Sequence, residues 1–357
     1  MSTPAVSVIM AAYNGAAVVG ETLASLAGQT FTDFEVVIVD DRSTDDTLAV
    51  LRAFDDPRVR VIAAEHNRGP VHSRNRAFAE ARGHYIAALD QDDLCHPLRF
   101  ARQVAYLDAH RETVLLSSAA SILINGQVSA SGHSAVTTPM LIEWLLRIEN
   151  PIVWSSVMLR ADAARALDPF TRPELLYAED FDLYHRIGRL GRIARLDAEL
   201  LSYRRHPDGA SQRFTDTMAA SATRVLAECY APLFGDEAVA TAELVARHIM
   251  DCQPIPDRAA LQRLGIALVA LQEEFITERR PDPESLALIR WETARRWGRV
   301  GRASLRSGSI GLGDAVAVRP DHLGLGYTGI EDLILSRLVG GARTARRYYT
   351  ARRADTA

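Results

Sequence analysis

Apolar stretches that suit β-strands alternate with amphipathic stretches that suit helices over the first 125 residues. Residues 34–39 are apolar at nearly every position, as in a strand that is covered on both faces of its sheet. Regular alternation of strands and helices is typical of a parallel sheet in an α/β fold. The predicted strands span residues 6–12, 34–39, 59–63 and 84–89, and the predicted helices between them span residues 17–27, 43–54 and 70–82.

The alternation continues less regularly to about residue 203. Ser43 or Thr44 is predicted to cap the second helix through its hydroxyl group. The pair Asn125-Gly126 is a hairpin turn signal. The later predictions are helices over residues 97–110, 140–148 and 179–190, and strands over residues 113–124, 152–159 and 193–203.

Strand patterns stop near Phe214, and helical stretches rich in alanine, leucine and arginine follow. We therefore expect an α/β domain over residues 1–214 and a helical region over residues 215–357. The last helical stretch, residues 330–349, is amphipathic and basic. Two roles are open for it: contact with an anionic membrane surface, or packing on the main domain or on another subunit of a homo-oligomer. The other predicted helices span residues 217–230, 238–251, 258–279 and 283–305.

Composition narrows the class of protein. A chain of 357 residues with 48% hydrophobic and 24% charged residues is typical of a soluble globular protein. The formal charge of −4 argues against nucleic acid as a partner. The three cysteines show no metal or redox spacing, and no apolar stretch approaches the roughly 18–20 residues that cross a bilayer. We expect a cytoplasmic protein, either free or in peripheral contact with the inner face of the membrane.

All 41 basic residues are arginine, and the absence of lysine excludes both a Schiff-base lysine and a P-loop lysine.

An acidic turn, Asp90-Gln91-Asp92-Asp93, directly follows the predicted strand over residues 84–89. Such a turn places carboxylates at the carboxyl edge of the sheet, where open α/β sheets bind ligands. Hard oxygen donors of this kind suit Mg²⁺ or Mn²⁺, which in turn holds a diphosphate. The sequence therefore predicts a metal-assisted nucleotide site at this edge.

Several motifs, in order along residues 5–215, are similar to those of the family 2 glycosyltransferases. They are Val6-Ser7-Val8-Ile9-Met10-Ala11-Ala12-Tyr13-Asn14, Val39-Asp40-Asp41-Arg42-Ser43-Thr44-Asp45, Asn67-Arg68-Gly69 with Ser73-Arg74-Asn75, the acidic turn, Glu179-Asp180-Phe181-Asp182-Leu183 with Arg186, and Tyr203-Arg204-Arg205-His206. The resemblance implies a GT-A fold, which is a Rossmann-like α/β fold with a mixed sheet, here followed by a helical C-terminal extension. It also implies a nucleoside-diphosphate-sugar donor, with UDP- or dTDP-sugars favoured, and an acceptor hydroxyl.

The resemblance assigns the base and ribose of the donor to the turns after the first two strands. Tyr13 is expected to pack against the base, with Ala12 and Asn14 in the same turn. Asp41 is expected to accept a hydrogen bond from a base N–H group, and Asp40 to brace the turn. The family's usual Pro-Thr is replaced by Ala11-Ala12, so a hydroxyl contact near the base is in doubt.

The diphosphate and the metal ion are assigned to the acidic turn. Asp92 is the expected direct metal ligand, and Asp90 faces the ribose or a metal-bound water. Gln91 is expected to contact the nucleotide-sugar donor. Arg74 is a cation whose planar guanidinium group suits phosphate oxygens. His206 is expected to complete the metal or diphosphate shell.

Asp180 is the candidate catalytic base for the acceptor hydroxyl. It lies in the first turn of a predicted helix, where the helix dipole is expected to lower its pKa and keep it ionised. Glu179 is the alternative base if the register is shifted by one residue. The resemblance implies inversion at the anomeric carbon through a single displacement.

Other classes of protein fit the sequence less well. A dinucleotide-dependent oxidoreductase needs a glycine-rich turn after the first strand, which is absent here. A sugar-nucleotide nucleotidyltransferase usually carries a glycine-rich basic loop at that place. A non-catalytic binding protein would not need the intact Asp90, Asp92 and Asp180. The Gln-x-x-Arg-Trp motif of processive synthases lacks its Gln at residues 287–291, so we expect transfer of one sugar, to a surface glycan, a lipid-linked acceptor or a natural-product intermediate.

Overall fold

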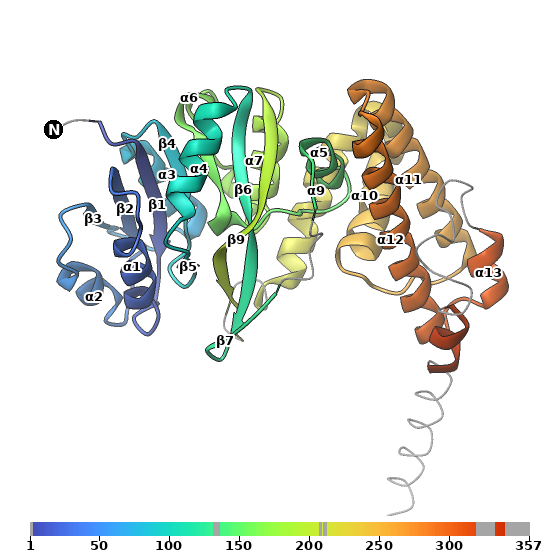
Figure 1. Ribbon diagram of the computed structural model, residues 1–357. Coiled ribbons are helices and arrows are strands. Elements are labelled where there is room, and N and C mark those ends of the chain that lie inside the picture. Colours follow the sequence, from blue (N-terminus) through green and yellow to red (C-terminus); the bar gives the residue numbers. More distant parts are fainter. Residues whose placement is uncertain (1–2, 131–135, 207–208, 210–212, 319–332, 340–357) are drawn as a thin grey trace, which may run out of the picture. The chain divides into compact units, whose positions relative to one another are not determined.

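The computed structural model of the protein describes residues 3–130, 136–206, 209, 213–318 and 333–339. The chain divides into two compact units, whose helices and strands are labelled in Figure 1. The first unit comprises Met1–Leu146 and Asn150–Val225, and the second comprises Arg147–Glu149 and Leu226–Ala357. The domain boundary expected between residues 214 and 215 stays a prediction.

A mixed β-sheet organises the first unit. Its strands, in chain order, are β1 (Val6–Ala12), β2 (Phe34–Asp40), β3 (Val59–Ala63), β4 (Tyr85–Ala88), β5 (Leu94–Cys95), β6 (Thr113–Ile124), β7 (Gln127–Ser129), β8 (Met158–Arg160) and β9 (Arg192–Arg204). Their order across the sheet is β3-β2-β1-β4-β8-β6-β9-β5, with β7 paired to β6. The first four strands of this order are parallel. β8 is antiparallel to both of its neighbours, and β9 is parallel to β6.

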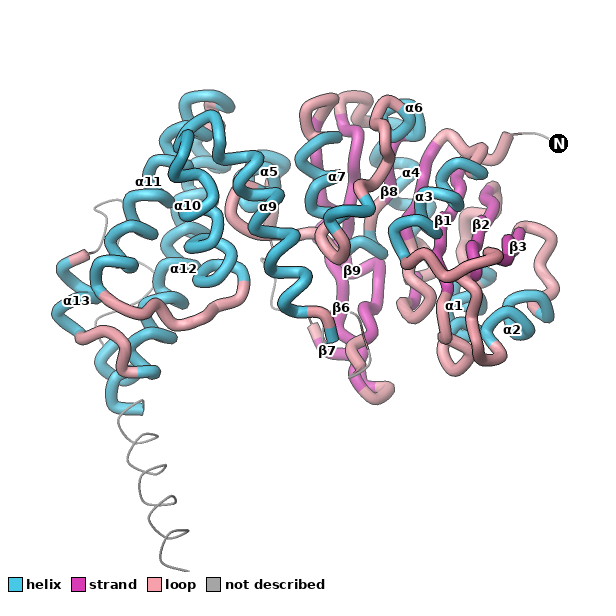
Figure 2. Tube along the Cα trace, turned by 180° about the vertical axis from the view of Figure 1, so that it is seen from behind, coloured by secondary structure: helices cyan, strands magenta, loops and turns pink. Residues whose placement is uncertain are grey.

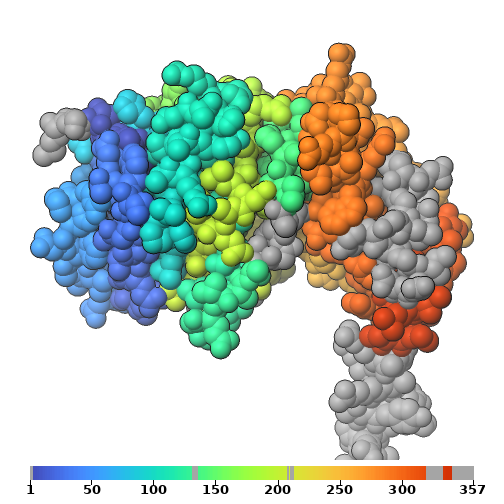
Figure 3. Space-filling view, viewed as in Figure 1, coloured from blue at the N-terminus to red at the C-terminus, as the bar shows by residue number. Residues whose placement is uncertain are grey.

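Helices cover both faces of this sheet. α1 (Val19–Ala27), α2 (Thr47–Ala53) and α4 (Arg99–Ala109) share one hydrophobic core with inward residues of the central strands. α1 and α4 lie next to each other at the surface in Figure 3. α3 (Pro70–Glu80) and α7 (Glu179–Ile187) lie on the opposite face, which Figure 2 shows from behind. The remaining helices of this unit are α5 (Pro139–Leu146), η1 (Trp154–Ser156), α6 (Ala161–Arg165), η2 (Pro173–Leu175) and the start of α9 (Thr215–Phe234).

The core explains why the apolar runs form strands. Side chains of a strand alternate between the two faces of its sheet. Val8 and Met10 of β1 and Val36 of β2 are buried with Leu23 of α1 in one cluster, whereas Ile9 is buried outside that cluster. Both faces of the central strands are therefore covered, as the continuous apolar run over residues 34–39 predicts. The Asn125-Gly126 hairpin is also confirmed, because both residues have a positive φ and β6 pairs with β7 across them.

The strand predicted over residues 152–159 is wrong for its first part. The 3₁₀-helix η1 takes that place, and only Met158–Arg160 is a strand. The hydroxyl and backbone N–H groups of Ser156 both bond the carbonyl of Val153, at 2.7 and 2.9 Å. A serine that bonds its own backbone favours a turn over an extended strand.

The predicted cap of the second helix is also wrong. α2 begins at Thr47, with Asp46 as its N-cap and no side-chain cap bond. The hydroxyl group of Ser43 instead bonds the carboxylate of Asp40 at 2.5 Å. Arg42 has a φ of 59°, so the chain turns sharply before the helix begins. The hydroxyl that seemed suited to a helix cap therefore closes the turn after β2.

The second unit is helical among the residues that the structure describes. The stretch predicted as one helix over residues 238–251 ends in a π-helical turn, while the helix predicted over residues 258–279 is confirmed. Glu292 is buried beside Arg296, which also pairs with Glu149. These helices are the rest of α9, η3 (Gly235–Glu237), α10 (Ala238–Val245), the π-helix η4 (Ala246–Met250), α11 (Arg258–Arg279), α12 (Pro283–Ser307) and α13 (Leu312–Ala317).

The predicted basic helix over residues 330–349 falls largely outside the described residues. Its described part, residues 333–339, is helical. Leu333 is buried there, whereas Leu335 and Leu338 are 60% and 65% exposed. No helix within the described ranges is both long enough and apolar enough to span a bilayer.

Candidate active site

The site lies at the carboxyl edge of the sheet, where the turns after β1, β2 and β4 meet. Gln91 of the acidic turn joins two of these turns. Its amide accepts from the backbone N–H of Tyr13 at 2.9 Å and donates to the carbonyl of Tyr13 at 3.0 Å. A Cβ atom on Gly15 would lie 2.3 Å from the amide oxygen of Gln91. A side chain at position 15 would therefore have to displace the amide of Gln91 from its contact with Tyr13.

The turn after β2 is held by the two aspartates that were predicted there. Asp40, the expected brace, bonds both the hydroxyl and the backbone N–H of Ser43. Asp41 accepts from the backbone N–H groups of Arg68 and Gly69, at 3.0 and 2.8 Å. Each carboxylate oxygen of Asp41 is thus bonded once and keeps a second lone pair for a ligand.

The first turn presents an aromatic ring at the rim of the site. Tyr13 is 44% exposed, whereas the side chain of Ala12 is buried. Asn14 has a φ of 48°, and its side-chain oxygen accepts from the backbone N–H of Thr44 at 2.8 Å. Asn14 therefore links the turn after β1 to the turn after β2, and Tyr13 is left open to a planar ligand.

Two carboxylates of the acidic turn have different neighbours. Asp92 Oδ2 lies 3.0 Å from His206 Nε2, and both side chains are partly exposed. Asp93 is buried and accepts from the backbone N–H of Arg204 at 2.8 Å. Burial, reinforced by Asp90, raises the pKa of Asp92. Burial also raises the pKa of Asp93 well above its usual range. Asp93 is thus a structural support, while Asp92 and His206 face the open side.

The donor set of Asp92 and His206 fits a divalent ion. Mg²⁺ takes ligands at about 2.0–2.1 Å in octahedral geometry, so two ligands at right angles lie about 3 Å apart. In the structure, Asp92 Oδ2 and His206 Nε2 are hydrogen-bonded to each other at 3.0 Å, so the two donor atoms are close enough to share one ion once that hydrogen bond is released. Within the described ranges, no three His, Cys, Asp or Glu side chains form a fuller ligand set. Such an ion would take its remaining ligands from phosphate oxygens and water.

Arg74 bridges the acidic turn and the start of helix α7. Its guanidinium pairs with Asp90 at 2.7 Å and with Glu179, and it lies 5.2 Å from the ring centroid of Trp154. Burial opposes the charge of Arg74, but the two carboxylates outweigh burial and raise its pKa. Arg74 was predicted to face the diphosphate. The structure places it between two acids of the site, and its contact with the diphosphate stays a prediction.

Asp180 lies in the first turn of α7, beside Glu179. Its Oδ1 accepts from the backbone N–H of Phe181 at 2.7 Å, and its Oδ2 accepts from the amide of Asn150 at 3.0 Å. Burial, with a further contribution from the neighbouring Glu179, raises the pKa of Asp180 to about 7. The expectation of a lowered pKa is wrong, because burial outweighs the helix dipole and both hydrogen bonds.

The sequence reasoning missed three residues of this site: Asn150, Trp154 and Ser155. The hydroxyl of Ser155 accepts from the backbone N–H of Asp90 at 3.0 Å. All three lie in or near the segment that was predicted as a plain strand. The only local signal is Asn150-Pro151, because a residue that precedes proline is restricted to extended conformations.

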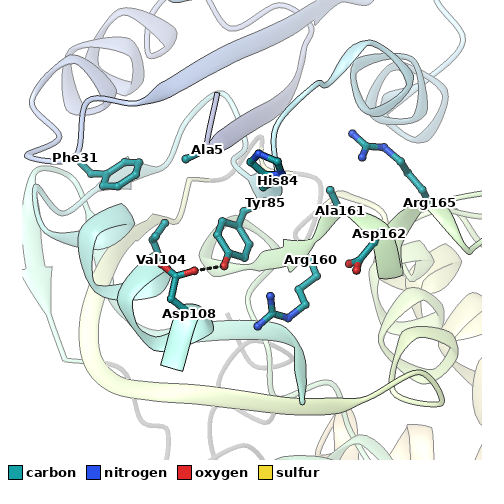
Figure 4. A pocket seen from close by; sticks show the side chains of 10 residues that line it. All are labelled: Ala5, Phe31, His84, Tyr85, Val104, Asp108, Arg160, Ala161, Asp162 and Arg165. Atoms are coloured by element: carbon teal, nitrogen blue, oxygen red, sulfur yellow. Dashed lines mark hydrogen bonds between the residues drawn. The ribbon is translucent and has the colours of Figure 1, made fainter. Parts of the chain in front are cut away.

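A hollow of about 570 Å³ lies at the amino ends of β1 and β4 (Figure 4), at the opposite edge of the sheet from the acidic turn. Tyr85, which begins β4, donates to the carboxylate of Asp108 at 2.5 Å within it. Arg160 lies beside this pair, but its guanidinium already donates to the backbone carbonyls of Thr113 and His110. Because its lining residues lie at the amino ends of the strands, this hollow is separate from the site at the carboxyl edge.

Comparison with known proteins identifies the family of the chain. The sequence model of the family described as "Glycosyl transferase family 2" matches residues 7–162. EpsE of Bacillus subtilis, which is named as a putative glycosyltransferase, is 30% identical over 218 residues, covering 59% of this chain and 77% of that protein.

Solved structures of low sequence identity share the fold. The structure of Staphylococcus aureus TarS 1–349 in complex with UDP-GlcNAc has a TM-score of 0.51 and 19% identity, covering 93% of this chain and 90% of that chain. The mannosyltransferase PcManGT from Pyrobaculum calidifontis, in complex with GDP-Man and Mn²⁺, has a TM-score of 0.50 and 18% identity, covering 95% of this chain and 88% of that chain. Together with the match to EpsE, these findings show that the chain belongs to glycosyl transferase family 2 and is a glycosyltransferase with the GT-A fold.

Proposed function

We propose that this glycosyltransferase moves one sugar from a nucleoside-diphosphate-sugar to an acceptor hydroxyl, with inversion at the anomeric carbon and without processive polymerisation. UDP- and dTDP-sugars are the favoured donors. The observation that carries the proposal is the bridge from Arg74 to Asp90 and Glu179. Because Asp180 directly follows Glu179, this bridge joins the acidic turn and a proton acceptor in one site.

The nucleoside of the donor is proposed to bind to the turns after β1 and β2. The exposed ring of Tyr13 packs against the planar base, and the free lone pairs of Asp41 accept from a base N–H group. Asp90 is near the ribose, with one oxygen held by Arg74. Arg42, which stands where the family often has glycine, is exposed beside this pocket and influences the choice of base.

Asp92 and His206 are the residues proposed to hold Mn²⁺ or Mg²⁺ together with the diphosphate. When bound, the ion acts as a Lewis acid that stabilises the charge of the departing diphosphate. Support comes from the direct contact between these two side chains, which are hydrogen-bonded to each other, and from PcManGT, whose structure contains Mn²⁺ with GDP-Man.

Asp180 is proposed as the general base of a single displacement. The acceptor oxygen forms a bond to the anomeric carbon as the bond from that carbon to the diphosphate oxygen breaks. The proton of the acceptor hydroxyl passes to the carboxylate of Asp180. A pKa of about 7 suits this role, because an effective base has a pKa near the working pH.

We expect UDP or dTDP, with Mn²⁺, to raise the melting temperature of the protein. A ligand at about 100-fold over its Kd adds about 2.7 kcal/mol to the free energy of unfolding. The check is a thermal-shift titration with UDP, dTDP and GDP, with and without Mn²⁺. In the Asp92→Asn variant, the additional shift that Mn²⁺ gives should disappear.

The matched control is Asp162→Asn, which changes an exposed aspartate near the opposite edge of the sheet. This variant should keep the full Mn²⁺-dependent shift. Absence of any shift with all three nucleotides would overturn the donor assignment. An Asp92→Asn variant with an unchanged response to Mn²⁺ would remove Asp92 from the proposed metal ligands.

We further propose that the helix containing residues 333–339 contacts an anionic membrane surface, which suits a lipid-linked acceptor. Leu335 and Leu338 are exposed there, and Arg337 lies between them in the sequence. Exposed apolar side chains next to arginine favour the surface of an anionic bilayer. We expect the double variant Leu335→Glu, Leu338→Glu to lose most of its binding to anionic liposomes in flotation assays.

Ile266 of α11 offers a control, because it is 62% exposed and the change Ile266→Glu adds the same kind of charge. That variant should float as the unchanged protein does. Equal flotation of the double variant and the unchanged protein would exclude the membrane role and favour packing on another subunit, which sedimentation velocity measures.

A further inference from the structure

Asn150 is held in one orientation beside Asp180. Its Nδ2 donates to Asp180 Oδ2 at 3.0 Å, and its Oδ1 accepts from the backbone N–H of Ile152 at 3.2 Å. The backbone N–H of Ile152 can only donate, so the oxygen of the Asn150 amide must face it. The NH₂ group is therefore directed at Asp180. Pro151 follows directly and restricts the backbone of Asn150 to extended conformations.

The charged groups around Asp180 act in opposite directions. Burial and the carboxylate of Glu179 disfavour its ionised form, whereas the guanidinium of Arg74 favours it. Tyr184, whose pKa burial raises well above its usual range, is neutral and adds no charge. The hydrogen bonds from Asn150 and from the backbone N–H of Phe181 also favour the carboxylate. Of these two donors, Asn150 is the side chain, so it is the one that a substitution removes.

An amide is well suited to support a general base. A cation in hydrogen-bond contact with a carboxylate lowers its pKa by about 1–3 units, which weakens its ability to take a proton. A neutral N–H donor favours the ionised form without adding a charge. It also leaves the second lone pair of Oδ2 available for the acceptor hydroxyl.

We propose that Asn150 is a positioning residue for the reaction, whose hydrogen bond holds the carboxylate of Asp180 in place and aims it at the acceptor hydroxyl. The inference rests on the proposed function, because it requires Asp180 to be the base. It adds a residue that lies outside the family motifs found in the sequence and acts through Asp180 rather than by touching the sugar.

The test is the pH dependence of kcat in Asn150→Ala and Asn150→Asp, measured with the nucleotide-sugar identified by the thermal-shift screen. Loss of a hydrogen bond to the carboxylate disfavours its ionised form and so raises its pKa, and one pKa unit corresponds to a tenfold change in the ionised fraction. We therefore expect the acid limb of the kcat–pH profile to move to higher pH by about one unit. At pH 6, kcat relative to the plateau should then be about tenfold lower than in the unchanged enzyme. Asn150→Asp should move the limb at least as far, because it brings a second carboxylate to the base.

Asn75→Ala is the matched control. The amide of Asn75 donates to and accepts from the backbone of Thr171, and this pair lies apart from the bonds that Asp180 accepts. Its loss should lower the melting temperature without moving the acid limb. Nucleotide affinity should be retained in both Asn150 variants. Asn150→Asp keeps an oxygen that accepts from the backbone N–H of Ile152 and has nearly the same shape as asparagine. Its pH profile therefore still tests the proposal if Asn150→Ala fails to fold.

The possible results separate this inference from the proposed function. A shifted acid limb in the Asn150 variants, together with an inactive Asp180→Asn, supports both. An unshifted limb together with an inactive Asp180→Asn overturns the role of Asn150 and leaves the base in place. Transfer that persists in Asp180→Asn overturns the proposed base, and the inference about Asn150 with it.

Discussion

Replacement of Asp180 by asparagine is expected to lower kcat by about 10²–10⁴-fold while nucleotide affinity stays nearly unchanged. The substitution removes the proton acceptor and preserves the shape of the side chain, and a general base contributes about that factor. Single-turnover transfer and nucleotide titration measure the two quantities separately. In the unchanged enzyme, kcat should rise with pH and level off above about pH 7, where Asp180 is ionised.

The same variant should be more stable than the unchanged protein at pH 8. Burial raises the folded-state pKa of Asp180 from 3.8 to about 7. A raised pKa means that the folded state favours the protonated carboxyl, so its stabilising contribution is complete below about pH 3.8 and is lost as pH rises to about 7. The amide of the variant never ionises, so its melting temperature should be higher at pH 8, by about 2–4 °C for each kcal/mol of this contribution. The difference should vanish near pH 4.

Asp182, two residues later in α7, is the control for both effects. It is buried and pairs with Arg172 and Arg186, so Asp182→Asn should reduce stability at pH 8 rather than raise it. Folded Asp182→Asn enzyme should keep its kcat. If Asp180→Asn transferred sugar at the normal rate, the base would have to lie elsewhere, with Glu179 as the first candidate.

Replacement of Arg74 by alanine is expected to cost about 3–5 kcal/mol in the free energy of unfolding. That is the usual penalty for removing one partner of a buried ion pair, because the remaining charge stays buried. Here two carboxylates lose their partner: Glu179, whose side chain is 4% exposed, and Asp90, whose side chain is 30% exposed. Denaturant unfolding at pH 7.5 measures the change. Folded Arg74→Ala enzyme should also lose most of its transfer activity, because the acidic turn and α7 are no longer joined.

Arg74→Lys refines this prediction. A lysine carries the charge but lacks the planar fork that lets arginine bond two carboxylates at once, so it should recover stability only in part. Arg60→Ala is the surface control, because Arg60 and Glu80 are both about 40–50% exposed, and exposed pairs contribute about 0–1 kcal/mol. A loss in Arg74→Ala no larger than that of Arg60→Ala would contradict the bridging role.

Local apolar patterns predicted the bounds of several strands. The bounds of β1, β3 and β6 agree with the apolar runs over residues 6–12, 59–63 and 113–124. The segment before β8 was misread, because apolar residues there occur at a spacing that suits either a strand or a short 3₁₀ turn. The serine hydroxyls that decide between the two act on their own backbone, which apolar spacing does not reveal.

The site was predictable in its residue types but not in its contacts. The acidic turn and the acidic start of α7 were both visible in the sequence. The bond between Arg74 and Glu179 joins residues 105 positions apart, and no local pattern indicates such a pair. The raised pKa of Asp180 likewise depends on burial by distant parts of the chain, which overrides the local helix dipole.

The contact between Gly15 and Gln91 has a practical consequence for redesigning donor choice. A methyl group at position 15 would displace the amide of Gln91 and break both of its bonds to Tyr13. Libraries aimed at a new nucleobase should therefore leave position 15 fixed. They can vary Tyr13, whose side chain is exposed, and Arg42, whose guanidinium donates to the backbone carbonyl of Glu65, because neither side chain takes part in the glycine–glutamine contact.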